Sequence, residues 1–93
     1  MSITIALLIA ALAAAGIVLV LAFLSVSKIR EKIREGHSDY FKAIIKKKYT
    51  TMGVDVVDVE IKDIFGNTID EESYASLDGI SSELYSGRTV YKN

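Results

Sequence analysis

The N-terminal end of this chain is an uncharged, strongly apolar stretch, which constrains the fold more than any other feature. The 11 basic and 12 acidic residues of the 93-residue sequence all lie between Lys28 and Lys92. Residues 3–26 have the sequence ITIALLIAALAAAGIVLVLAFLSV. As a helix they would extend about 36 Å, which exceeds a hydrocarbon core of about 30 Å. Because a helix satisfies its own backbone hydrogen bonds in lipid, the stretch predicts a transmembrane helix over residues 1–27.

A cleaved signal peptide is the alternative interpretation of the same stretch. Ala13-Ala14-Ala15 resembles a small-residue cleavage site. The basic region that precedes the apolar core of such peptides is missing, and residues 17–26 would leave a second apolar segment after the cut, so the helix is preferred. Basic residues follow the stretch and none precedes it. The positive-inside rule therefore predicts a single-pass protein with its N-terminus outside and its C-terminal domain in the cytoplasm.

Small residues recur along one side of the predicted membrane helix. Ala6, Ala10 and Ala14 follow one another at intervals of four, and Ala13 lies beside them. Lipid provides no hydrophobic drive for helix pairing, so close backbone approach at small residues stabilises such pairs. The four alanines predict a packing face for another helix. The alternative is that alanine is simply common in membrane spans.

Helical periodicity continues beyond the apolar stretch. Between residues 28 and 50, apolar positions recur at intervals of three and four with charged residues on the other side. We expect an amphipathic juxtamembrane helix here, with a kink or a break at residues 36–39, where Gly36 could end a first segment. The basic residues expected to bind a membrane surface or a partner are Lys28, Arg30, Lys32, Arg34, Lys46, Lys47 and Lys48.

Charge is segregated along the remainder of the chain. Residues 28–48 hold eight basic and three acidic residues, whereas residues 55–83 hold nine acidic residues and one lysine. The basic segment could contact anionic lipid, or it could face the acidic segment within one chain or between copies. Nucleic acid is not expected as a partner, because no aromatic platform or known motif accompanies the lysines.

Residues 51–93 predict a small α+β domain. β-Branched residues alternate with charged ones over residues 54–64 and predict a strand, which a turn at residues 65–68 follows. A capping box favours a short helix over residues 70–77, and a hairpin through Gly66-Asn67 is the alternative. A second short helix is expected over residues 78–86, and a short final strand over residues 88–91. The predicted fold is thus a transmembrane helix, an amphipathic helix and a small α+β domain.

The sequence offers few groups for catalysis or metal binding. There is no cysteine, so thiolate ligands are excluded, and His37, the single histidine, is expected to be solvated at the helix break. No serine stands in a nucleophile motif. The sequence therefore predicts no catalytic residue, no metal or cofactor site and no small-molecule substrate. Four acidic residues that could gather a cation miss the spacing of a calcium-binding loop: Asp55, Asp58, Glu60 and Asp63.

Two interpretations of function remain. The preferred one is a non-enzymatic accessory or structural subunit of a membrane-associated assembly, whose partners are the lipid bilayer and either a membrane protein or additional copies of the chain. The alternative is a self-assembling filament or pore subunit with an exported domain, because an apolar helix, an amphipathic helix and a β-containing head have a pilin-like layout. The basic leader and the acidic residue of type IV pilins are missing, since Ile5 is apolar.

Overall fold

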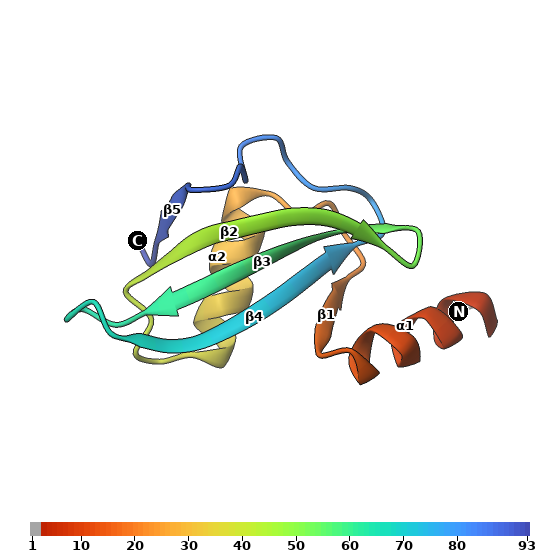
Figure 1. Cartoon of the computed structure of the whole chain (residues 1–93), viewed down its shortest axis with the longest axis horizontal. Coiled ribbons are helices and arrows are strands. Elements are labelled where there is room, and N and C mark those ends of the chain that lie inside the picture. Colours follow the sequence, from red (N-terminus) through yellow and green to blue (C-terminus); the bar gives the residue numbers. More distant parts are fainter. Residues whose placement is uncertain (1–2) are drawn as a thin grey trace.

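A five-stranded sheet forms the centre of the structure, which is a computed structural model that describes residues 3–93 (Figure 1). The strand order is β1-β4-β3-β2-β5, with β1 parallel to β4 and the other neighbours antiparallel. The described residues thus form a small α+β domain. Along the chain, its elements are α1 (Ile3–Ala14), β1 (Ile17–Val20), α2 (Val26–Gly36), β2 (Lys42–Thr51), β3 (Val54–Lys62), β4 (Thr68–Ser76) and β5 (Thr89–Tyr91).

The apolar N-terminal stretch is divided among three elements. α1 ends at Ala14, Gly16 has a φ of 78°, and Ile17–Val20 pairs with β4 in parallel. Residues with positive φ stop a helix, and the backbone groups of β1 find their partners in β4 instead. None of the helices in residues 3–93 is both long and apolar enough to cross a membrane. The transmembrane helix predicted over residues 1–27, of which residues 1–2 lie outside the described part, is therefore wrong, together with the single-pass location and orientation.

The predicted amphipathic helix is present as α2, but it is shorter than predicted. Ser25 caps its start by accepting the Lys28 N–H at 3.1 Å, and α2 ends at Gly36. Residues 42–51, which we expected to be helical, form β2. Ala43 and Ile45 are buried at alternate positions and are paired with Ile61 and Val59 of β3, so period-two burial overrides the helical spacing.

The C-terminal half is predicted better. The strand expected over residues 54–64 is confirmed as β3, and the final strand is confirmed as β5. The hairpin alternative is also confirmed, since Asp63 accepts the N–H groups of Phe65 and Asn67, each at 2.9 Å, and β4 follows. The short helix predicted over residues 70–77 is thus wrong, because these residues pair with β3. Residues 78–86 contain turns and a bridge between Leu24 and Ile80 rather than a helix.

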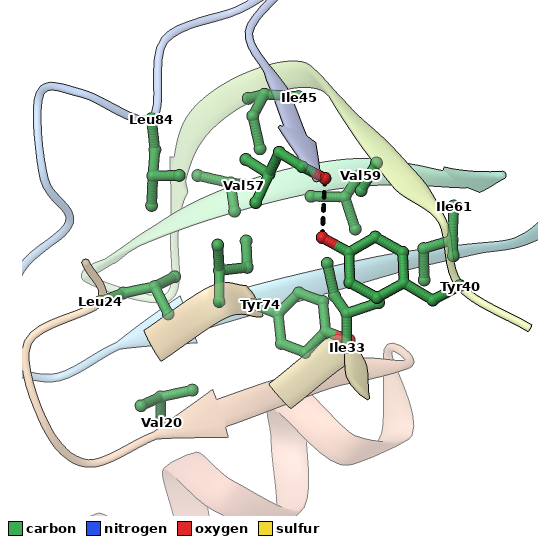
Figure 2. Close-up of a cluster of buried hydrophobic side chains, with 13 residues drawn as sticks. Val20, Leu24, Ile33, Tyr40, Ile45, Val57, Val59, Ile61, Tyr74 and Leu84 are labelled. Atoms are coloured by element: carbon green, nitrogen blue, oxygen red, sulfur yellow. Dashed lines mark hydrogen bonds between the residues drawn. The ribbon is translucent and has the colours of Figure 1, made fainter. Parts of the chain in front are cut away.

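The two faces of the sheet carry separate apolar clusters. α2 covers one face, where Ile29 and Ile33 pack on the sheet, and the Tyr40 hydroxyl donates a hydrogen bond of 2.7 Å to the Val90 carbonyl (Figure 2). On the second face, Leu12 of α1 packs against residues of β1, β3 and β4, including Val56. Leu12 is the one fully buried residue of α1 within the described chain, so most of this helix projects beyond the sheet (Figure 1).

Candidate functional site

α1 and β1 together present a large exposed apolar surface, which we call the α1–β1 surface. Ile3 and Leu7 on α1 are 80% and 66% exposed, and neither helix nor strand contains a charged residue. Monomeric proteins rarely leave a contiguous apolar area of this kind in water, and such areas typically mark interaction sites. The exposed large apolar side chains of this surface and of the segment after β1 are Ile3, Leu7, Val18, Leu21 and Phe23.

The α1–β1 surface is hollowed between the helix and the strand. A groove of about 550 Å³ lies between Ile9 and Ala13 of α1 and a second group of residues, which are Gly16, Ile17, Val18, Leu19 and Leu21. β1 pairs with β4 on one side only, and its other side has no strand partner in the described chain. The surface therefore combines a protruding helix, an adjoining hollow and an open sheet edge.

The four alanines predicted to pack against another helix all lie at exposed positions of α1: Ala6, Ala10, Ala13 and Ala14. The structure thus brings the predicted packing residues together on one element. This element, α1, is a helix of 12 residues and not part of a continuous membrane helix. The alanines remain accessible to a partner, which is the condition that the packing prediction needs.

The predicted basic residues are split between α2 and β2. On α2, Lys28 pairs with Glu31 at 3.8 Å and Lys32 with Glu35 at 3.6 Å. Arg30 donates to the Tyr91 carbonyl at 2.7 Å, Lys46 lies 4.0 Å from Glu60, and Lys48 donates to the Ser81 carbonyl at 3.3 Å. Lys47 lies over the Tyr49 ring, 5.3 Å from its centroid. Five of the seven predicted cations thus contact oxygen atoms of the same chain. Of the amphipathic helix predicted over residues 28–50 with a kink or a break at residues 36–39, only α2 is helical, and the three lysines at 46–48 lie on β2.

Sequence reasoning missed a cluster that joins the end of α2 to β4. His37 Nε2 lies 2.8 Å from Asp70 Oδ2 and 3.2 Å from Glu72 Oε1. The other ring nitrogen, Nδ1, lies 3.3 Å from the Ile33 carbonyl oxygen. Glu72 also accepts a hydrogen bond from the Tyr74 hydroxyl through its second oxygen. His37 is thus held between a helix end and two carboxylates rather than being solvated as expected.

The register of β4 explains why these side chains meet. Asp70, Glu72 and Tyr74 are paired with Ile61, Val59 and Val57, whose side chains face α2. Partners in an antiparallel pair point to the same face, so both carboxylates lie beneath the end of α2. The sequence itself does not mark these positions, because Glu71 and Ser73 between them are polar too. The three residues share a face only because the segment is a strand.

The cluster shifts the pKa values of its members in opposite directions. Partial burial alone lowers the pKa of His37, but the hydrogen bond to Asp70 and the charge of Glu72 outweigh it and raise the pKa above its ordinary 6.5. The hydrogen bond from His37 lowers the pKa of Asp70 below its ordinary 3.8. Both shifts favour the ion pair, in which His37 is protonated and Asp70 is charged.

We expect a pH dependence of stability from this ion pair in metal-free protein. A raised pKa makes the His37 contribution complete below pH 6.5 and removes it as the pH rises through the folded-state pKa. The lowered pKa of Asp70 makes its contribution complete above pH 3.8. The free energy of unfolding, measured by urea titration, should therefore decline above about pH 6.5 more steeply than in His37→Gln. Parallel pH profiles for the two proteins would contradict this expectation.

The four acidic residues weighed as a cation site have separate structural partners instead. Asp55 accepts from the Thr50 hydroxyl, Asp58 from the hydroxyls of Tyr49 and Ser73, and Glu60 pairs with Lys46 and Lys62. Asp63 holds the β3–β4 turn. These carboxylates stabilise the sheet and its turns. Comparison of the chain with protein-family models, curated proteins and solved structures found no match.

Proposed function

We propose that this chain is a non-enzymatic assembly module that pairs with a second copy of itself through the α1–β1 surface. The observation that carries the proposal is the exposure of an uncharged, apolar helix, on which Ile3 is 80% and Leu7 66% accessible. Removal of apolar area from water favours association and opposes the entropic cost of bringing two molecules together. Pairing of two such helices would cover the surface that the single chain leaves open.

A second copy fits this surface for an electrostatic reason. The surface contains no charged residue, since the first 27 positions of the sequence have none. Two copies can therefore approach across a twofold axis without repulsion between like charges. A charged partner, in contrast, would find no complementary group on α1 or β1. In a twofold contact each copy offers the same patch, so the patch must be compatible with itself, and an uncharged apolar patch meets this condition.

The shape of the α1–β1 surface also favours a second copy of the chain as its partner. Leu7 protrudes from α1, while the groove beside Ala13 and Val18 provides a hollow on the same molecule. In a twofold arrangement, protruding side chains of each copy can enter the hollow of the other. The exposed alanines let the two helices approach closely. The open side of β1 offers the same unpaired backbone groups on both copies, and such edges readily pair with an identical strand.

The test is the oligomeric state of the full chain in dilute aqueous buffer. We expect sedimentation equilibrium to show a dimer, and Leu7→Asp to raise the dimer dissociation constant at least about tenfold, which corresponds to ~1.4 kcal/mol. Ala10→Leu should act in the same direction by separating the helices. Ile64→Asp is the matched control, because Ile64 is 67% exposed in the distant β3–β4 turn, and it should dimerise like the wild type.

Several outcomes would overturn the proposal. One is a wild-type monomer at all accessible concentrations, and another is a Leu7→Asp variant that dimerises as tightly as Ile64→Asp. A monomer that co-sediments with phosphatidylcholine vesicles through Leu7 would identify a lipid surface as the occupant instead. Circular dichroism of each variant verifies that the fold is retained, since Leu7 lies outside the buried clusters.

A further inference from the structure

We infer that His37, Asp70 and Glu72 form a binding site for a divalent transition-metal ion, with Zn²⁺ as the best fit. One ligand atom from each residue lies within 4.8 Å of the other two. Tetrahedral Zn²⁺ with bonds of about 2.0–2.1 Å needs ligand atoms roughly 3.3 Å apart. The Nε2–Oε1 distance is already 3.2 Å, and the Nε2–Oδ2 distance of 2.8 Å would have to widen slightly. This inference does not depend on self-assembly.

The orientation of the His37 ring favours a cation at this place. A carbonyl oxygen can only accept, so the contact of Nδ1 with the Ile33 carbonyl at 3.3 Å places a proton on Nδ1. In the neutral ring, Nε2 then presents its lone pair toward two carboxylate oxygens, which are also acceptors. A proton on Nε2 satisfies these acceptors when His37 is charged, and a metal ion can take the place of that proton when the ring is neutral. Histidine ligands of metals commonly donate their other ring N–H to a backbone carbonyl, as His37 does.

The two carboxylates are held in the same manner. Glu72 uses one oxygen toward His37, and its other oxygen accepts from the Tyr74 hydroxyl. Asp70 uses Oδ2 toward His37, while its Oδ1 accepts the Glu71 N–H at 2.8 Å. Each ligand thus has a second contact that fixes its direction, which is the arrangement that raises metal affinity in proteins.

Burial indicates how the site would open to solvent. The side chains of His37 and Glu72 are 13% and 26% exposed, whereas that of Asp70 is 45% exposed. A metal ion would therefore be held against the body of the domain and keep a water-accessible position on the Asp70 side. One imidazole with two carboxylates suits Zn²⁺ and similar transition metals better than Mg²⁺ or Ca²⁺, which prefer all-oxygen ligand sets.

The test is calorimetric titration of the chelator-treated full chain with Zn²⁺ near pH 7.5. We expect one ion per chain, and a dissociation constant at least tenfold higher in Glu72→Gln and in His37→Gln. Glu71→Gln is the matched control. Glu71 lies on the same strand but is paired with Glu60 on the opposite face, so this variant should bind Zn²⁺ like the wild type. Mg²⁺ should not compete at equal concentration.

Absence of Zn²⁺ binding to the wild-type chain would overturn the inference. Equal loss of binding in Glu71→Gln and Glu72→Gln would also overturn it, because it would indicate unspecific attraction to acidic residues. If a variant is unstable, Co²⁺ bound to the wild type provides a second measurement. We expect intense visible absorption from a four-coordinate site with a nitrogen ligand, and a weak octahedral spectrum would count against the proposed ligand set.

Discussion

Replacing Ile61 with alanine should lower the free energy of unfolding by about 2–5 kcal/mol, the usual cost of truncating a buried isoleucine. Ile61 is fully buried on the central part of the sheet, in the cluster that α2 covers together with Ile33 and Tyr40 (Figure 2). The truncation removes apolar contacts and leaves a cavity that the paired strands on both sides cannot close. Urea unfolding followed by circular dichroism measures the change.

The same substitution at Ile64 is the control for this prediction. Ile64 is 67% exposed in the turn after β3, so Ile64→Ala should change the free energy of unfolding by less than about 0.5 kcal/mol. Small domains have total stabilities of roughly 5–15 kcal/mol, so a large part of the stability is lost in Ile61→Ala alone. Equal effects at the two isoleucines would show that β3 does not lie beneath α2.

The elements that the sequence predicted correctly are those with an unambiguous local pattern. Val57, Val59 and Ile61 alternate with charged residues and define β3, and Gly66-Asn67 defines the turn after it. For residues 68–76 a capping box competed with the hairpin. The two patterns are compatible with the same residues, and the antiparallel pairing with β3 decides between them.

The N-terminal half was mispredicted because hydropathy and spacing do not report tertiary partners. Residues 3–26 are apolar enough for a membrane helix, yet β1 takes its hydrogen bonds from β4, more than fifty positions later. In the same way, the spacing of Phe41, Ile44 and Ile45 matches a helix, but pairing with β3 makes these residues part of a sheet or its edge. Non-local pairing of this kind leaves no signal in the segment itself.

The candidate metal site was missed for a related reason. His37 and Asp70 are 33 positions apart, and their contact requires that residues 68–76 form a strand. The helix preferred for residues 70–77 would have placed Asp70 and Glu72 on different sides. Ala6, Ala10 and Ala14, in contrast, fall on one side of any helix because of their spacing of four, and their role in packing stays a prediction.

Gly16 provides the sharpest discrimination between the predicted helix and the observed arrangement. Gly16→Ala should destabilise the protein by about 1–2 kcal/mol, because alanine at a φ of 78° is strained. A Cβ at this position meets no described atom within 4 Å, so backbone strain accounts for the whole cost. In one continuous helix over residues 3–26, the same change would stabilise the protein by about 1 kcal/mol.

Gly36→Ala, in contrast to Gly16→Ala, should not lower the free energy of unfolding. Gly36 is the last residue of α2, its φ is not positive, and a Cβ there also meets no described atom within 4 Å. Alanine should therefore be neutral or stabilising there by up to about 1 kcal/mol. Urea unfolding of both variants measures the change in the free energy of unfolding and therefore its sign in each case. If Gly16→Ala stabilised the protein as Gly36→Ala does, the helix would continue through residue 16, and both β1 and the groove beside α1 would be lost with it.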